Sequence, residues 1–314
     1  MSRSQAAALA LLAVALVTLP YWIGRVGLYQ YLGIEILVWG LYALSFNLLL
    51  GYTGLPSFGH GAYFGVGAYA FGLMQKFVSA NLWLDLGGAV LAAALCGALV
   101  AAFISHRRGI YYALMTIAFG QVLWFIAVKW HSVTGGEDGL LNLKRMPAEL
   151  GFVSISLTDN VSLYYFVLVV SCLAAFLLWR IVHSPFGRVI QAIRQNETRA
   201  AFIGYNVWLY KWLVFVISAG LSGLAGALFA LSQLGAFPDV MSLNSSGFVV
   251  MMTLIGAALF FVARDALGAL TSTWPLWYGL MFMAIVLLKP EGIAGLFQSR
   301  RARAAPPIAT QAGD

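Results

Sequence analysis

The chain has 314 residues, of which 61% are hydrophobic and 9% charged, with a net charge of +7 and a mean hydropathy of +0.87. Soluble domains carry about 25% charged residues, so this composition excludes an ordinary soluble enzyme or binding domain. The positive charges lie beside apolar runs, which indicates a role in membrane topology rather than in binding nucleic acid.

Long apolar segments follow one another along the chain, and segments of roughly 18 residues are typical of membrane-spanning helices. They lie at about 6–24, 33–50, 57–75, 82–104, 110–130, 161–182, 212–233, 246–262 and 268–288. The sequence therefore predicts an all-α polytopic membrane protein with roughly 8–10 transmembrane helices, including broken or re-entrant segments. The first segment is expected to be retained, because no small-x-small cleavage site follows it before Pro20, Tyr21 and Trp22.

Residues 51–72, GYTGLPSFGHGAYFGVGAYAFG, combine seven glycines, a proline and a histidine with aromatic residues, without any Asp, Glu, Lys or Arg. Glycine destabilises a helix interior by about 1 kcal/mol relative to alanine, but in a membrane it lets helix backbones approach closely. Gly61 and Gly65 form a G-x-x-x-G pair. Gly54, Pro56 and Gly59 precede this pair, where a regular helix is not expected.

Broken backbone at membrane depth is tolerated only where it is buried in protein or lines a water-filled cavity. Discontinuous helices commonly mark a substrate path, so we expect residues 54–67 to line one. The alternative is a tightly packed helix pair without substrate contact. No second His, Cys or carboxylate lies at ligand spacing from the histidine of this stretch, so no metal site is expected. The residues predicted to line the path are Asn47, Ser57, Gly59, His60, Gly61, Tyr63, Gly65, Thr116 and Gln121.

Lys and Arg collect beside helix ends on the cytoplasmic side of a membrane. With a cytoplasmic N-terminus, Arg107, Arg108 and the basic segment 183–211 fall inside, and the connection 131–160 falls outside in the periplasm.

The basic tail, residues 289–314, also favours a cytoplasmic C-terminus. Three apolar segments follow residue 211, however, and three full crossings would put the tail outside. The segment 246–262 is therefore expected to be re-entrant or broken.

Residues 183–211, HSPFGRVIQAIRQNETRAAFIGYNVWLYK, are too polar to cross a membrane and too patterned for a simple connection. Ser184 and Pro185 are typical of a helix start, and Asn196 can cap a second short helix that ends at Gly204. Two short cytoplasmic helices indicate a docking element for a soluble partner. The alternative is an amphipathic helix that lies on anionic lipid.

A second run of small residues, SAGLSGLAGALFALS, occupies residues 218–232. It brings Ala219 and Gly223 to one helix face and Ser222 and Gly226 to a neighbouring one. Such a surface is typical of helix–helix packing in membranes, and we expect a packing seam here rather than a binding site.

Taken together, these stretches resemble the LivM-type permease subunits of ATP-binding-cassette importers for branched-chain amino acids. The resemblance rests on motifs spread in order over most of the chain. They are SFNLLLGYTGLPSFGHGAYFGVGAYA, RGIYYALMTIAFGQ, TGGEDGL, SPFGRVIQAIRQNETRAAFIGYNVWLYKWLVFVISAGLSGLAGALFAL and LLKPEGIAGLF. The combination is specific to the family, although no single motif would be.

The resemblance implies a type II ABC-importer-like permease, with residues 1–314 as one transmembrane domain in the bacterial inner membrane. It implies a second, LivH-like permease subunit, two cytoplasmic ATPases and a periplasmic substrate-binding protein as partners, beside membrane lipid. A glutamate–alanine–glycine pattern marks the ATPase-docking loop of the family. The residues expected to couple to the ATPases are Arg188, Arg194, Glu197, Ala200 and Gly204.

The chain has no G-x-x-x-x-G-K-[ST] phosphate loop, so it is expected to bind no cofactor and to leave ATP hydrolysis to its partners. Branched-chain or other small hydrophobic amino acids are the expected substrates, and urea, amides or aromatic acids are alternatives. An ion-coupled secondary transporter would need acidic or histidine relays inside the spans, and a passive channel would have no use for the cytoplasmic segment. Arg264 and Asp265 replace the family's usual Gly-Pro turn, which leaves the role of residues 256–268 open.

Overall fold

The computed structural model describes residues 14–21, 31–78, 81–150 and 153–255. The chain divides into two units, residues 1–250 and 251–314, and the contacts given below lie within the first. The predicted span 268–288 and the basic tail lie outside the described residues, as do Arg264, Asp265 and the second half of segment 246–262.

The described part of the chain is built almost wholly of helices, and five of them are long and apolar enough to cross a membrane. The longer helices are α2 (Tyr31–Asn47), α3 (Gly61–Phe77), α4 (Leu82–Ile104), α5 (Gly109–Lys129), α7 (Asn160–His183), α10 (Val207–Gln233) and α11 (Leu243–Ile255). The shorter elements are the π-helical turn η2 (Leu48–Thr53), α6 (His131–Thr134), η3 (Gly136–Asp138), β1 (Ala148–Leu150), β2 (Val153–Ile155), α8 (Pro185–Gln195), α9 (Glu197–Phe202) and η4 (Pro238–Met241). The prediction of an all-α membrane protein is confirmed.

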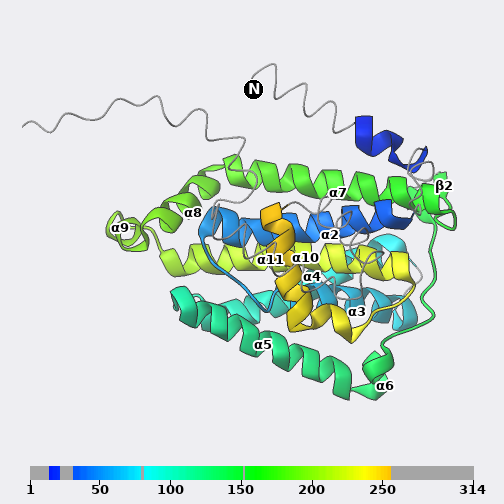
Figure 1. Cartoon of the computed structure of the whole chain (residues 1–314), viewed down its shortest axis with the longest axis horizontal. Helices are drawn as coiled ribbons and strands as arrows, with labels where there is room; N and C mark the ends of the chain where they lie inside the picture. The colour runs from blue at the N-terminus through cyan, green and yellow to red at the C-terminus, as the bar shows by residue number, and fades with distance from the viewer. Residues whose placement is uncertain (1–13, 22–30, 79–80, 151–152, 256–314) are drawn as a thin grey trace, which may run out of the picture. The chain divides into compact units, whose positions relative to one another are not determined.

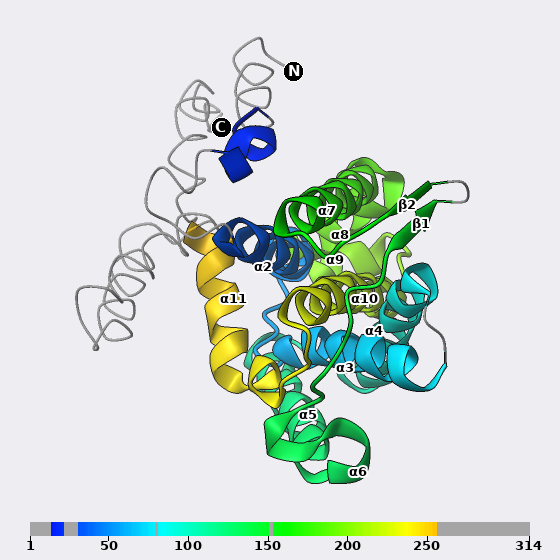
Figure 2. The same ribbon diagram turned by 90° about the vertical axis from the view of Figure 1, so that its right-hand side faces the viewer.

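Helix α10 lies at the centre of the bundle and packs against α4, α3 and α2. Figure 2 looks nearly along the helices and shows these neighbours around it, with α7 beside α2. The small residues of α10 make this close packing possible. A side chain at Gly223 would overlap Ala93 of α4, and one at Gly226 would overlap the backbone of Phe64 in α3. The predicted packing seam is therefore confirmed.

The connection 131–160 and the helices α8 and α9 lie at opposite ends of the long helices (Figure 1). The connection holds α6, η3 and the antiparallel pair of β1 and β2, in which Ala148 pairs with Ile155. Its TGGEDG turn has φ values of 80°, 69° and 75° at Gly135, Gly136 and Gly139, which favour glycine. The two regions thus fall on opposite sides of the bundle, as the sequence predicts.

The outward faces of the long helices are apolar. Leu91, Leu95 and Leu99 on α4 are exposed, as are Leu173 and Phe176 on α7. Surfaces of this kind suit lipid or another membrane subunit rather than water.

Candidate functional site: the broken helix and its contacts

The helix that begins at Tyr31 ends in an irregular turn, and a new helix starts only at Gly61. Within the turn, the Thr53 hydroxyl donates to the carbonyl of Leu48 at 3.0 Å, and the Leu55 amide donates to that of Leu49 at 3.0 Å. Gly54 has φ 74°, in the left-handed region that ends many helices. The prediction of broken backbone before Gly61 is therefore confirmed. We refer to residues 54–60 as the break.

Phe58 and Gly59 of the break lie directly against α5. The amide of Phe58 donates to Oγ1 of Thr116 at 3.1 Å. A side chain at Gly59 would overlap the backbone carbonyl of Thr116, and a Cβ at Gly120 would lie 2.9 Å from Cα of Gly59. Two backbones approach this closely only because both positions are glycine.

His60 is completely buried and connects the break to α10 and α2. Its Nε2 lies 3.1 Å from Oγ of Ser218 and 2.8 Å from Oγ of Ser222. Ser222 in turn lies 2.8 Å from Oγ of Ser45, and Ser218 donates to the Ser45 carbonyl at 2.6 Å. The three serines and His60 form one hydrogen-bonded group inside the apolar bundle, where unpaired polar groups would be costly.

The serine partners of His60 are residues that the sequence analysis missed as a polar site. Ser218 and Ser222 are four residues apart and therefore share one face of α10. That spacing was the available signal, but nothing in the sequence shows that this face meets residue 60. Aromatic rings complete the surroundings, with the Tyr42 ring stacked on the imidazole at a centroid distance of 6.0 Å.

The predicted G-x-x-x-G pair faces η4 and the first turn of α11. The amide of Gly61 donates to Oγ of Ser246 at 3.0 Å, and a Cβ there would lie 2.9 Å from the Val240 carbonyl. A side chain at Gly65 would overlap Met241. The pair therefore lets the chain that follows α10 return to the start of α3.

The predicted path residues differ in their exposure. Asn47 on α2 and Gln121 on α5 are half-buried. The others are buried within the described chain, namely Ser57, Gly59, His60, Gly61, Tyr63, Gly65 and Thr116. The structure thus buries most of the predicted residues in the break and in the helices beside it.

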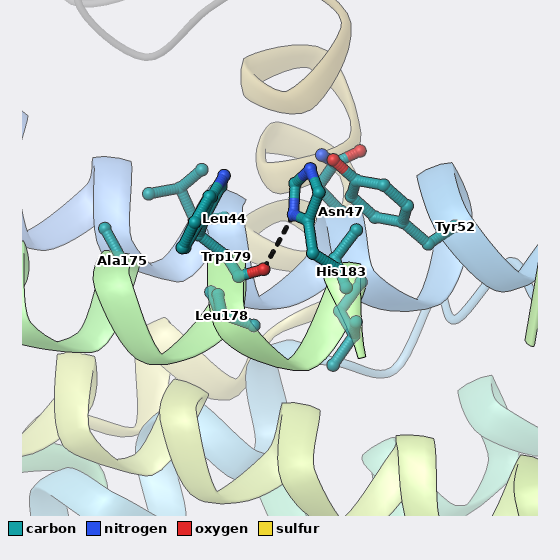
Figure 3. A pocket seen from close by; sticks show the side chains of 9 residues that line it. Leu44, Asn47, Tyr52, Ala175, Leu178, Trp179 and His183 are labelled. Carbon is teal, nitrogen blue, oxygen red and sulfur yellow. Dashed lines mark hydrogen bonds between the residues drawn. The ribbon is translucent and has the colours of Figure 1, made fainter. Parts of the chain in front are cut away.

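A pocket of about 140 Å³ opens between the end of α2 and the last turns of α7. Figure 3 shows His183 between Trp179 and the side chains of Asn47 and Tyr52. Nδ1 of His183 donates to the Trp179 carbonyl at 2.8 Å, which holds the imidazole on the indole ring. Of the predicted path residues, Asn47 lines this pocket.

The span α4 contains an acidic residue, Asp85, that was not among the residues singled out from the sequence. It lies in the first turn of α4, is completely buried, and has no hydrogen-bond partner for either carboxylate oxygen among the described residues. Burial without such a partner disfavours the negative charge of this carboxyl group.

The helices α8 and α9 begin where the sequence predicts. Oγ of Ser184 accepts from the Gly187 amide at 3.3 Å, and Oδ1 of Asn196 accepts from the Arg199 amide at 2.8 Å. Gly204 follows α9 with φ 99°. Both caps and the glycine stop are therefore confirmed.

Glu197, one of the predicted coupling residues, is engaged within its own chain. Oε1 lies 2.7 Å from Nζ of Lys211 and 3.1 Å from Nε of Arg108. The Lys211 side chain is 1% exposed, and its Nζ also donates to the Arg107 carbonyl at 3.2 Å. Because a buried ammonium group needs a counter-charge, Glu197 ties α9 to α10 and to the connection between α4 and α5.

The other predicted coupling residues divide into inward and outward positions. Ala200 is buried, and Arg194 is exposed but donates a hydrogen bond inward to the carbonyl of Gly51. Arg188 is exposed, and a Cβ at Gly204 would meet no atom within 4 Å.

The family described as branched-chain amino acid transport system / permease component matches residues 29–288. No solved structure matches the chain significantly.

Individual relatives agree with this family. The high-affinity branched-chain amino acid transport system permease protein LivM of Salmonella typhimurium is 26% identical over 82% of this chain and 68% of its own length. The probable LivM of Methanocaldococcus jannaschii is 26% identical over 70% of this chain and 74% of its own. The guanosine ABC transporter permease protein NupQ of Bacillus subtilis is 25% identical over 74% of this chain and 80% of its own length. The chain belongs to the branched-chain amino acid transport system permease family and is a LivM-type membrane component of an ABC transporter.

Proposed function

We propose that this chain is one of two permease subunits of an importer that carries branched-chain amino acids across the bacterial inner membrane. Its partners are a LivH-like permease, two cytoplasmic ATPases and a periplasmic substrate-binding protein, and both of its termini are cytoplasmic. The observation that carries the proposal is the match of the branched-chain family over residues 29–288. The two LivM relatives favour amino acids within that family.

The break forms the wall of the translocation path in this proposal. The buried Gly59 and His60 fix the shape of the wall, and the half-buried Asn47 and Gln121 offer uncharged polar groups to a passing substrate. A zwitterion meets dipoles there but no strong ionic trap. Substrate selection is then left to the binding protein, and alternating access moves the substrate.

The ATPases dock on residues 184–204. This assignment is supported by the apolar tip of the segment, where Phe202 is 88% and Ile203 69% exposed. Phe202 is the last residue of α9 and Ile203 follows it, at the end of the bundle that carries the basic residues Arg107 and Arg108. An exposed apolar tip on a polar segment is typical of a surface that a protein partner covers.

Uptake by cells tests the substrate. The chain and the transport genes beside it are expressed in a strain without its own leucine and nucleoside importers, and labelled leucine and labelled guanosine are compared. Leucine uptake that excess isoleucine and valine suppress is the expected result. Guanosine uptake without leucine uptake would instead assign the chain to the nucleoside branch, which the Bacillus subtilis relative represents.

Copurification tests the class of transporter. A tagged chain is expected to bring an ATPase and a second permease with it from detergent-solubilised membranes. A chain that transports leucine alone, without any ATPase, would be a secondary transporter or a channel and would overturn the proposal.

A further inference from the structure

The proposed docking helices contact the bundle in two different ways. α9 is held by the ion pairs of Glu197 with Arg108 and with Lys211, which lies near the start of α10. α8 instead packs against η2, where the broken helix ends. Ile190 of α8 is completely buried in the same hydrophobic cluster as Leu48, Leu49 and Leu55, which lie on both sides of Gly54.

Arg194 lies one helical turn beyond Ile190 and faces the same side of α8. Its guanidinium donates to the carbonyl of Gly51, within the last turn before the break. Carbonyls in a final helical turn have no following turn to donate to them. A cation also suits the negative end of a helix. Arg194 therefore caps the broken helix from a different element.

The aliphatic stem of Arg194 makes a second contact with the same helix end. A Cβ at Gly54 would lie 3.0 Å from Cγ of Arg194. Gly54 has φ 74°, so both its backbone conformation and its contact with the arginine favour glycine. The donor end and the stem of one side chain thus hold both the last turn of the helix and the first residue of the break.

We propose that Arg194 is a positioning residue that joins α8 to the break and passes movement of the docking helices to it. The inference rests on the proposed function, in which the ATPases dock on α8 and α9. When the ATPases displace α8, Arg194 and Ile190 carry the end of η2 with it. The chain then pivots at Gly54, and the shift reaches Gly59 and His60, which contact α5 and α10.

The test measures transport and ATP hydrolysis on the assembled complex in vesicles, with the substrate-loaded binding protein present. Arg194→Ala removes both donor and stem, and Arg194→Met keeps most of the stem and removes the donor. We expect Arg194→Ala to lower leucine transport per ATP hydrolysed by about tenfold, the order that a charge-assisted hydrogen bond supports. Arg194→Met should fall between Arg194→Ala and wild type, and Arg194→Lys, which keeps a cationic donor, should recover most of the ratio.

The ratio of transport to ATP hydrolysis distinguishes a residue that passes movement from α8 to the break from a purely structural residue. Loss of folding lowers the amount of complex, and loss of docking lowers the copurified ATPase, but neither changes the ratio in the complexes that remain. Arg180→Ala is the matched control, because Arg180 is an exposed arginine in the last turn of α7, outside the docking segment. It should leave the ratio unchanged.

A double-mutant cycle tests the contact itself. Gly54→Ala adds a methyl group against the arginine stem, so Gly54→Ala combined with Arg194→Ala should lose less than the sum of the two single effects. A normal ratio in Arg194→Ala, with ATPase copurifying, would overturn the role of Arg194 and leave the proposed function in place. A wild-type chain that copurifies no ATPase would overturn both.

Discussion

Single residues at the break differ in what a larger side chain would meet. Gly59 faces the backbone of Thr116, which cannot move aside without shifting α5, whereas Gly65 faces the flexible side chain of Met241. A Cβ added at Gly87 of α4 would meet no atom of the described chain within 4 Å. Steric cost therefore depends on the neighbour rather than on the residue type alone.

Gly59→Ala is expected to destabilise the protein by about 1–3 kcal/mol, because overpacking against fixed backbone displaces α5 from the break. Gly87→Ala is the matched control and should be neutral or stabilising by up to about 1 kcal/mol, since alanine favours the helix. Thermal unfolding of the purified variants in detergent measures both. Equal unfolding temperatures would contradict the close contact between the break and α5.

Asp85→Asn distinguishes the proposed importer from an ion-coupled transporter. Neither carboxylate oxygen of Asp85 has a hydrogen-bond partner among the described residues, so a neutral amide of the same shape should raise the free energy of unfolding by about 1 kcal/mol or leave it unchanged. Leucine uptake by the assembled importer should persist. An ion-coupled transporter that uses this acid would lose uptake in the same variant.

At the scale of elements, α8 and α9 are fastened to the bundle by polar contacts that cross between distant segments. Glu197 binds Lys211 and Arg108, and Arg194 binds the carbonyl of Gly51. The segment is thus an integral part of the permease rather than a flexible connection.

Glu197→Gln is expected to destabilise the protein by about 1–3 kcal/mol, because the buried ammonium group of Lys211 loses its counter-charge. Glu197 is itself 21% exposed, which places the effect below that of a fully buried pair. Adding Lys211→Met removes the unpaired cation and should restore part of the loss. Arg199→Gln, an exposed change on the same helix, should have no effect on the unfolding temperature.

The elements were largely predictable from the sequence, and their contacts were not. The segment predicted at 82–104 is found as Leu82–Ile104, because apolar length and the cap at Asn81 determine its ends locally. The partner of His60 at Ser222 is 162 positions away, and nothing local specifies it. The same holds for Glu197, whose motif match indicated a partner ATPase while its charge is engaged within the chain.

At the scale of the whole molecule, the proposed orientation in the membrane rests on the placement of the basic residues and is open to direct labelling. Leu141 of the connection 131–160 and Thr198 of α9 are exposed, and these two segments lie at opposite ends of the long helices (Figure 1). In a chain with Cys96 and Cys172 replaced by alanine, a cysteine at 141 should react with an impermeant maleimide in intact spheroplasts. A cysteine at 198 should react only after permeabilisation.

The basic tail provides a second orientation test. A cysteine at position 303 should behave as one at 198, because the arginines of the tail favour the cytoplasmic side. Reaction at 303 in intact spheroplasts would mean that the segments after α10 cross the membrane an even number of times, as two full crossings would, and it would contradict a re-entrant or broken segment there.

The central place of α10 affects the order of events during synthesis. Its partners α2, α3 and α4 leave the ribosome more than a hundred residues earlier, and chains grow at about 5–20 residues per second. For several seconds, the break and His60 lie without the serines and glycines that later enclose them. During that time α2, α3 and α4 lie in the bilayer, or beside the insertion machinery, and their polar and glycine-rich faces are not yet packed against α10. Truncated chains that stop before residue 207 should be rapid substrates for membrane proteases.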